Sequence, residues 1–408
     1  MADRVTVIGW DGSPPSGAAR AALGAATLVA GTRHHLALPE VPATAERIVL
    51  GSIDIAARRI AAHRGTAVVL ADGDPGFFGV VRALRAPELG LEVEVVPAVS
   101  VVARAFARAG MPWDDARVVL ATSRTLRRAV NVCRAYPKVA VLTAPGAGPA
   151  ELALLLTGVH RTFVICEALG TEQEQVTVLT SDKVADHIWR DPNVVLVVGG
   201  ITSGSPGVAG PGAPATQSRG GWIAGRDPGF PGPVRGWALP AAEYGGHLPA
   251  QVRALQLARL GPRSGDLVWD IGAADGSLAV EAARFGAAVI AVDSDADACD
   301  WVRATARRVG VQIQVVHGTA PAVLEDLPEP DVVRIGPADP EVAAAAAARR
   351  PERILAAAAI RDEAEALTRA LEEGGYDVDR SLVQSVELDA EWAERERSVN
   401  FVLCATRR

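Results

Sequence analysis

Three turns rich in glycine, proline and aspartate follow apolar runs in the first half of the chain. They are Asp72-Gly73-Asp74 after the run 66–71, Pro97 to Ser100 after the run 91–96, and Gly9 to Gly12 after the opening run 4–8. Open α/β sheets bind ligands outside the carboxyl ends of their strands. Any one of these turns is typical of an ordinary loop, but three at successive strand ends indicate a ligand site.

The second half carries a similar turn, which runs from Asp270 through Gly272 and Ala273 to Gly276 between an apolar run and a helical pattern. A helix N-terminus offers free N–H groups there, and glycine lets a ligand approach the backbone. Asp293 ends the next apolar run, where a carboxylate can accept hydrogen bonds from both hydroxyls of a ribose. Gly318, Thr319 and Ala320 follow a later run, where an adenine edge could lie.

This second turn is compatible with three interpretations. A dinucleotide site favours G-x-G-x-x-G, which is missing here, and does not require the acid at Asp270. An acid directly before the glycine turn, Asp293 and a C-terminal hairpin together resemble class I S-adenosylmethionine-dependent methyltransferases. The third interpretation is a tight turn without a ligand.

Elements that could position these turns alternate along the chain. In the first half, β-branched runs predict strands at 4–8, 66–71, 91–96, 118–121, 139–143, 163–166 and 194–198, with helices at 100–108 and 124–135 between them. Continuous apolar strands separated by helices are typical of a mainly parallel sheet that is covered on both faces. The predicted fold class is therefore α/β.

The alternation restarts after a break in composition. Residues 199–233 include 11 Gly and 6 Pro, which predicts a linker at 203–238 between domains at 1–202 and 239–408. The second domain should contain helices at 249–260, 277–285 and 296–309 and strands at 267–271, 288–292, 312–316 and 332–335. The final β-like segments, 376–388 and 398–405, leave no room for a helix between them, so we expect an antiparallel hairpin.

Composition excludes several classes of function. The chain has 408 residues and a net charge of −7, from 41 Lys and Arg against 48 Asp and Glu. This balance argues against a nucleic acid partner, which needs a basic surface. No apolar run approaches the roughly 18 residues of a membrane span, and we see no signal peptide. Four widely spaced cysteines favour a reducing cytoplasm, and no residue pattern indicates a metal site.

The first half resembles the tetrapyrrole methylase family. The resemblance rests on V-I-G-x-D-G near the start, G-T-R-H-H-L at 31–36, G-D-P-x-F-x-G at 73–79, V-P-A-V-S at 96–100, and a segment from Glu167 to Val176. It implies a tetrapyrrole methylase fold followed by a class I, Rossmann-like methyltransferase fold with a C-terminal hairpin. This fusion resembles the family of bifunctional precorrin-6Y methyltransferases (decarboxylating) of cobalamin synthesis.

The resemblance implies a division of labour. The first domain would methylate the ring at C-5, and the second would methylate C-15 and remove the ring C acetate carboxyl. S-adenosylmethionine would bind once per domain. The cofactor positions implied are Asp72, Gly73, Asp74, Ser100, Val101, Thr143 and Ala168 in the first domain, and Asp270, Gly272, Ala273, Gly276, Asp293, Gly318, Thr319 and Ala320 in the second.

The substrate of this family is a flat apolar ring fringed with carboxylates, so cationic side chains should line its cleft. Arg33, His34 and His35 match a family segment and are the candidates, with Asp11 and Gly12 near the ring. A solvated turn is the alternative for the Arg-His-His run. No residue is assigned to proton transfer or covalent catalysis, because the sulfonium donor is already activated. We also expect a homo-oligomer.

The second domain departs from the family pattern. Ala274 and Asp275 replace Gly and Ser in the turn, and Pro337 and Pro340 stand where the family has glycines. These changes leave open an alternative, in which the chain is a monofunctional C-5 methyltransferase and its second domain is a binding or assembly module. A nucleotide-binding oxidoreductase is a third possibility, which the missing G-x-G-x-x-G disfavours. The sequence does not reveal whether the ring carries cobalt.

Overall fold

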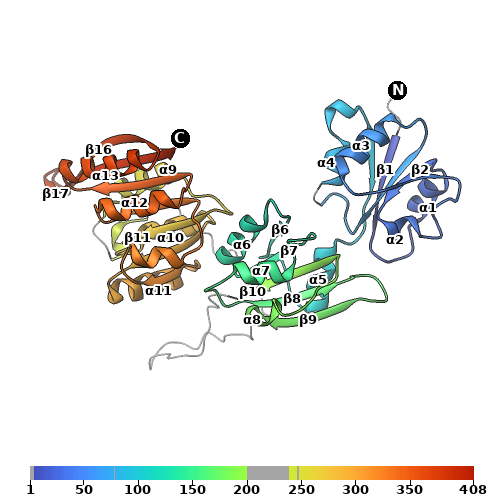
Figure 1. The fold of residues 1–408 in the computed structure, drawn as a ribbon, viewed down its shortest axis with the longest axis horizontal. Helices are drawn as coiled ribbons and strands as arrows, with labels where there is room; N and C mark the ends of the chain where they lie inside the picture. Colours follow the sequence, from blue (N-terminus) through green and yellow to red (C-terminus); the bar gives the residue numbers. More distant parts are fainter. Residues whose placement is uncertain (1–3, 78, 200–238, 246–247) are drawn as a thin grey trace.

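The computed structural model describes residues 4–77, 79–199, 239–245 and 248–408. The predicted linker at 203–238, with Trp222, Phe230 and Trp237, lies outside these residues. In the described part, three sheets follow one another along the molecule (Figure 1). None of the described helices has the length and apolar character that a membrane crossing requires.

The first sheet is wholly parallel, with the order β3-β2-β4-β1-β5. Its strands are β1 (Arg4–Trp10), β2 (Leu28–Gly31), β3 (Glu46–Val49), β4 (Ala67–Asp72) and β5 (Glu92–Val96). The helices of this unit are α1 (Gly17–Gly24), α2 (Arg33–Leu36), α3 (Ile53–Ala62), α4 (Val80–Leu84) and the 3₁₀ turn η1 (Pro87–Leu89). Sequence patterns missed β2 and β3, which have only four residues each.

The second sheet is mixed, with the order β6-β7-β10-β8-β9. Its strands are β6 (Arg117–Leu120), β7 (Lys138–Leu142), β8 (Thr162–Glu167), β9 (Gln175–Thr180) and β10 (Asn193–Val198). Only β6 and β7 pair in parallel, and the remaining pairs are antiparallel. The expectation of one mainly parallel sheet in the first half is therefore wrong, because the predicted strands divide between two sheets.

Helix α5 (Val101–Ala109) connects the two sheets, and α6 (Leu126–Ala135), α7 (Pro149–Leu155) and α8 (Ser181–Val184) belong to the second. Every residue of β10 is buried, as its unbroken apolar sequence requires. Ser100 is the N-cap of α5, because its hydroxyl oxygen accepts a hydrogen bond from Val102 N at 3.2 Å. The cap fixes where the chain turns from one sheet to the other.

The third sheet has the order β13-β12-β11-β14-β15-β17-β16, with reversal between β11 and β14. Its strands are β11 (Leu267–Ile271), β12 (Ala288–Asp293), β13 (Gln314–His317), β14 (Val332–Ile335), β15 (Arg353–Ala358), β16 (Tyr376–Leu388) and β17 (Glu394–Arg407). Its helices are α9 (Ala250–Leu260), α10 (Ser277–Arg284), α11 (Ala296–Val309), α12 (Pro340–Ala348) and α13 (Arg361–Glu373), with 3₁₀ turns η2 (Ala241–Glu243) and η3 (Ala322–Asp326). Such a doubly wound sheet binds ligands at the point of reversal.

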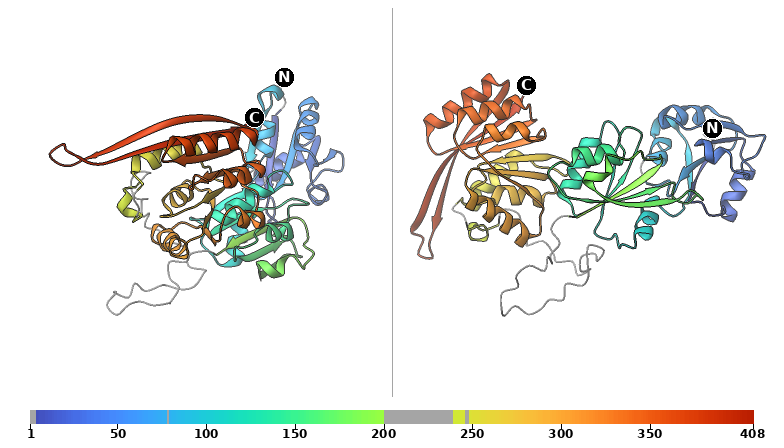
Figure 2. Two further views of the ribbon diagram at one scale, coloured as in Figure 1. Left: turned by 60° about the vertical axis from the view of Figure 1, so that its left-hand side comes forward. Right: turned by 60° about the horizontal axis from the view of Figure 1, so that its bottom comes forward.

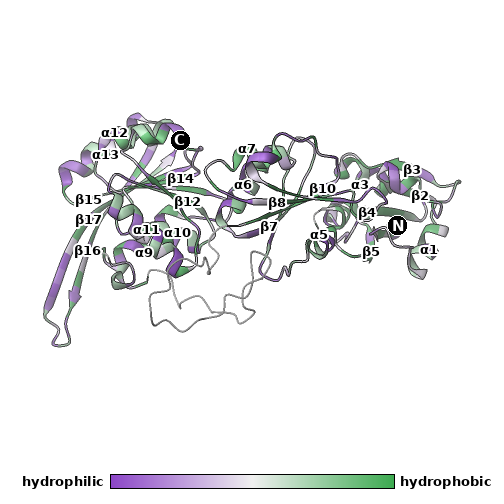
Figure 3. Cartoon of the chain, turned by 90° about the horizontal axis from the view of Figure 1, so that it is seen from below, coloured by the Kyte–Doolittle hydropathy of each residue, from purple (hydrophilic) through white to green (hydrophobic). Residues whose placement is uncertain are grey.

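The predicted hairpin is confirmed, because β16 and β17 pair antiparallel over their length. It projects beyond the rest of the third sheet (Figure 2). Figure 3 shows mostly hydrophilic residues on its outer part and apolar residues along the inner strands. Sequence patterns missed β15, α12 and α13, which complete the sheet and one of its faces.

Contacts between the second and third sheets are more extensive than the linker composition suggested. Asn131 on α6 donates to the carbonyl oxygen of Gly265 at 3.0 Å. Arg127, one turn earlier, pairs with Asp331 at 2.9 Å, and Arg134 donates to Gln314 Oε1 at 3.1 Å. The interface is polar, as interdomain interfaces within a chain commonly are. The side chain of Arg127 is thus engaged at this interface.

Candidate active sites

The loops after β4 and β5 meet, although their strands are not neighbours. Strand β1 lies between β4 and β5, but it has Gly9 near its end. A Cβ atom at Gly9 would lie 2.3 Å from Gly73 O and 2.8 Å from Ala98 N. A Cβ at Gly73, whose φ is +64°, would lie 2.8 Å from Val101 N. Because Gly9 and Gly73 have no side chains, the two predicted cofactor loops can approach each other closely.

Asp72 contacts the two histidines that we assigned to the ring. Its Oδ1 lies 3.0 Å from Nε2 of both His34 and His35, and the Thr32 hydroxyl lies 2.9 and 3.0 Å from their Nδ1 atoms. Burial opposes ionisation of Asp72, but the histidine contacts outweigh it and hold the pKa of Asp72 well below its usual value. His35 is fully buried, whereas His34 and Arg33 are exposed. Only the latter two can therefore meet a ligand directly.

Thr143 and Ala168 lie at one edge of the second sheet. Antiparallel β10 begins beside the ends of β7 and β8, and Thr143 Oγ1 is 2.7 Å from the carbonyl oxygen of Asn193, the first residue of β10. Ala168 follows β8 with a left-handed φ of 49°. A Cβ at Gly12 would lie 2.1 Å from Gly170 O, so the loop after β8 reaches the loop after β1. Through this contact, the candidate ligand-binding loop after β1 of the first sheet meets the loop after β8 of the second sheet.

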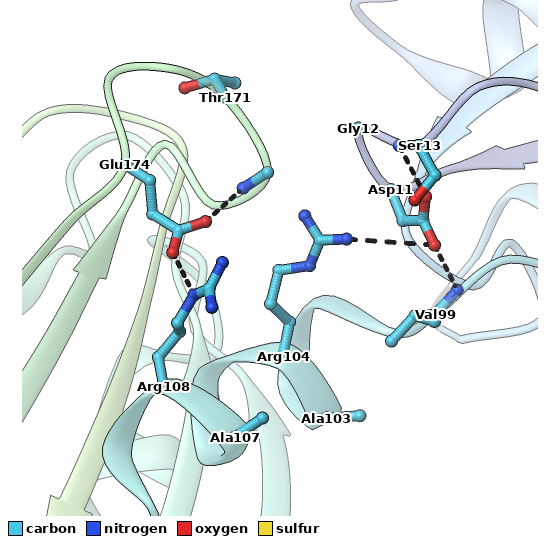
Figure 4. Close-up of a pocket in the computed structure, with 11 residues that line it drawn as sticks. Asp11, Gly12, Ser13, Val99, Ala103, Arg104, Ala107, Arg108, Thr171 and Glu174 are labelled. Carbon is cyan, nitrogen blue, oxygen red and sulfur yellow. Dashed lines mark hydrogen bonds and ion pairs between the residues drawn. The ribbon is translucent and has the colours of Figure 1, made fainter.

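A cavity of about 500 Å³ lies where these loops meet over α5 (Figure 4). We call it the inter-sheet pocket. Its lining comes from both sheets and from α5, and consists of Asp11, Gly12, Ser13, Val99, Ala103, Arg104, Ala107, Arg108, Gly170, Thr171 and Glu174. The pocket therefore contains Asp11 and Gly12, the two loop residues that we placed near the ring. Its volume is in the range of small-molecule sites.

Both carboxylates of the pocket are held in the ionised form. Asp11 accepts hydrogen bonds from Ser13 N at 3.0 Å and Val99 N at 3.1 Å. Desolvation opposes ionisation, but these backbone donors hold the pKa of Asp11 below its usual value. Glu174 accepts from Gly170 N at 2.8 Å and pairs with Arg108, and these contacts outweigh desolvation to lower the pKa of Glu174.

In the third sheet, the Asp270 turn lies at the reversal between β11 and β14. Gly272 and Gly276 both have φ +69°. A Cβ at Gly272 would lie 2.5 Å from Pro337 Cδ, and one at Gly276 2.8 Å from Val302 Cγ2. Pro337 therefore packs directly on the turn, in the place where we noted a departure from the family's glycines. Ala274 adopts a left-handed φ of 49°.

Asp293 already holds this turn. Its Oδ2 accepts from Ala274 N at 2.8 Å, and its Oδ1 accepts from Asp295 N at 3.0 Å. Each carboxylate oxygen has a second lone pair, so a ribose can still be bound. The Asp293 carbonyl oxygen accepts from Gly318 N at 2.8 Å, which brings the loop of Gly318, Thr319 and Ala320 beside Asp293. Asp275, in contrast, is used locally, because it accepts from Ser277 N at 2.9 Å.

Arg334 forms a buried ion pair beneath the turn. Its Nη1 lies 3.0 Å from Asp270 Oδ1 and donates to Gly272 O at 2.8 Å. Asp270 is 1% exposed, and burial raises its pKa although Arg334 opposes the shift. A Cβ at Gly336 would lie 2.7 Å from Arg334 Nη1. Glycine at this position thus leaves room for the guanidinium.

Several buried polar atoms around this turn have no hydrogen-bond partner among the described residues. They are Asp270 Oδ2, Ser277 Oγ and Arg334 Nε. Native proteins rarely leave such atoms unsatisfied, and waters or ligands commonly account for them. Their concentration around the turn supports a polar binding site at this edge of the third sheet.

Comparisons with known proteins identify the family of this chain. A family model described as tetrapyrrole (corrin/porphyrin) methylases matches residues 16–185, and one described as precorrin methyltransferase domain matches residues 244–390. A curated protein from Sinorhizobium sp, named precorrin-6Y C(5,15)-methyltransferase (decarboxylating), is 32% identical over 340 residues, which cover 81% of this chain and 76% of that protein. The chain belongs to this family.

Two shorter proteins that are similar to parts of this chain are named for single activities. A cobalt-precorrin-7 C(5)-methyltransferase from Salmonella typhimurium is 37% identical over 167 residues, 39% of this chain and 80% of that protein. A probable cobalt-precorrin-6B C(15)-methyltransferase (decarboxylating) from Pyrobaculum calidifontis is 35% identical over 137 residues, 31% of this chain and 70% of that protein. Relatives named for the C(5) activity alone and for the C(15) activity alone therefore both match this chain.

Sequence reasoning missed the cations Arg104, Arg108 and Arg334. Arg104 and Arg108 lie one and two turns after Ser100 on α5, and this spacing is a signal that could have placed them on one face of the helix. Arg334 interrupts the apolar strand β14. A cation within a buried strand is a signal for a buried partner.

Proposed function

We propose that this chain uses S-adenosylmethionine to methylate a corrin-ring precursor, precorrin-6Y or its cobalt form, at C-5 and C-15 and to decarboxylate the ring C acetate. The observation that carries the proposal is the match to a precorrin-6Y C(5,15)-methyltransferase over 81% of the chain. A match of this extent favours the bifunctional enzyme over a monofunctional C-5 methyltransferase. The reaction belongs to cobalamin biosynthesis.

We propose one cofactor site per domain. In the first domain, the cofactor would be held by Asp72, Gly73, Asp74, Ser100, Val101, Thr143 and Ala168, and the close approach of loops over Gly9 supports this assignment. In the second domain, the turn 270–276, Asp293 and the loop 318–320 would hold it, and the unsatisfied polar atoms beside the turn support a ligand there. The cofactor supplies a methyl group on a sulfonium, which needs no further activation.

The residues of the chain bind and orient the reactants. Arg33 and His34 are exposed beside the first cofactor loop, where they can meet carboxylates of the ring. His35 is buried and acts through Asp72, whose carboxylate it contacts at 3.0 Å, so we assign it a positioning role. Holding carbon, methyl and sulfur in line and excluding water provide the remaining rate enhancement.

We further propose a cytoplasmic homo-oligomer with domains at 1–202 and 239–408. The four cysteines are free, as in a reducing compartment. Strand β16 is an edge strand that pairs only with β17 within the described sheet, and Leu382 on it is 62% exposed. An exposed edge of this kind favours association with another copy.

Calorimetric titration of the full chain with S-adenosylhomocysteine tests the assignment of two sites. We expect two molecules bound per chain, with two affinities, because the two sites differ in every contact. A stoichiometry of one would instead support the monofunctional alternative, in which the second domain is a binding or assembly module. An absence of binding would contradict the proposed function altogether.

A further inference from the structure

Arg104 is the least satisfied charged group of the inter-sheet pocket. Its side chain is 19% exposed, and its nearest carboxylate oxygen, Asp11 Oδ2, is 4.0 Å away. This distance is too long for a hydrogen bond. Within the described ranges, the ion pair with Asp11 is its only direct polar contact. Figure 4 shows its guanidinium pointing into the gap between the loop of Asp11 and the loop of Glu174.

The carboxylates nearby cannot satisfy Arg104 without losing other partners. Asp11 accepts from two backbone N–H groups, and Glu174 accepts from Arg108 and from Gly170 N. Backbone also confines the guanidinium, because a Cβ at Gly170 would lie 2.2 Å from Arg104 Nη1. The pocket contains two carboxylates, but neither has an oxygen at hydrogen-bond distance from the guanidinium of Arg104.

We propose that Arg104 binds a carboxylate of a bound reactant in the first domain. This inference rests on the proposed function, which supplies two sources of carboxylate, the side chains of the tetrapyrrole and the amino acid end of the cofactor. A planar guanidinium pairs with carboxylate through two parallel hydrogen bonds. The lining of the pocket favours the ring, because it includes Asp11 and Gly12 and none of the residues assigned to the cofactor.

Variants of the full chain test this role by calorimetric titration with two probes. One probe is S-adenosylhomocysteine, and the other is a corrin ring with free carboxylate side chains. Arg104→Gln should weaken binding of the probe whose carboxylate it holds by about ten- to a hundredfold, since hydrogen bonds to charged groups are the strong ones. Arg104→Lys keeps the positive charge but cannot form two parallel hydrogen bonds, so it should lose less affinity than Arg104→Gln. Arg59→Gln, which removes an exposed pair with Glu46, is the control.

The outcomes separate the sources and the hypotheses. A loss for the ring alone assigns the carboxylate to the substrate, and a loss for S-adenosylhomocysteine alone assigns it to the cofactor. Unchanged affinity of Arg104→Gln for both probes would overturn the role of Arg104. An equal loss of affinity for a ring whose side chains are amides would also overturn it, because packing and not charge would then explain the loss. Failure of the unmutated chain to bind either probe would overturn the proposed function itself, and this inference with it.

Discussion

Replacing Arg334 with methionine should destabilise the third sheet through Asp270. The substitution keeps an apolar stem on β14 but removes the guanidinium that lies 3.0 Å from Asp270 Oδ1. Asp270 is 1% exposed and Arg334 is 13% exposed at the side chain, so the carboxylate would remain buried without its cation. Gly272 O would lose its donor as well.

The expected loss of stability is about 3 kcal/mol. Removing one partner of a buried ion pair commonly costs about 3–5 kcal/mol, and the partial exposure of Arg334 favours the lower end. The double variant Asp270→Asn with Arg334→Met leaves no buried charge and should regain part of this loss. It should therefore be more stable than Arg334→Met alone.

Native-state hydrogen exchange of the full chain is the suitable assay, because peptides from β11 and β12 report this sheet separately. A loss of about 3 kcal/mol corresponds to exchange that is more than a hundredfold faster. The loss should also depend on pH. Burial raises the folded pKa of Asp270, so the native state holds more protons than the unfolded chain, and stability falls as pH rises above the unfolded value. Without Arg334 the fall should be larger, and the variant's deficit should grow from about pH 4 to neutrality.

Three results would refute this reasoning. The first is a loss below about 1 kcal/mol at neutral pH, which is ordinary for a surface position. The second is a double variant that is no more stable than the single one, because the damage would then come from packing. The third is a deficit that is constant with pH, which would exclude a buried charge as its cause.

Three further outcomes follow from the geometry. Gly73→Ala should abolish C-5 methylation, since its Cβ would lie 2.8 Å from Val101 N. The control Gly90→Ala, at φ +61° in open space, should leave this methylation intact. Equal effects of the two variants in a methyl-transfer assay would contradict the placement of the cofactor at Gly73. Asp293→Ala should remove one of two S-adenosylhomocysteine sites, and the exposed Asp300→Ala should remove none; two retained sites with unchanged affinity would exclude the ribose role. Limited proteolysis should cut first between 203 and 221, and first cleavage within a sheet would count against the boundary.

Strands with long apolar runs could be located from sequence, but their pairing could not. Runs such as 194–198 and 267–271 became β10 and β11 close to the expected bounds. A buried antiparallel strand such as β10 has the same apolar sequence as a buried parallel one. For that reason the division of the first half into two sheets could not be predicted from the sequence. The short strands β2 and β3 gave too few residues for a pattern.

The positions of the candidate loops were predictable where glycine and aspartate mark strand ends, whereas contacts between distant segments could not be predicted. Asp11 and Gly12 were placed correctly at a strand end, and they line a pocket. Arg104 belongs to no motif, and its importance follows from loops of two sheets that meet around it. The partnership of Arg334 with Asp270 crosses two strands that are 64 residues apart in sequence.

Mass spectrometry of the product tests the central claim most directly. The full chain is incubated with precorrin-6Y and isotopically labelled S-adenosylmethionine, and the ring is recovered. We predict that the ring gains two labelled methyl groups and loses one carboxyl group as CO₂, as one methylation in each domain with decarboxylation in the second requires. A ring that gains a single methyl group and keeps every carboxyl group would contradict the bifunctional account.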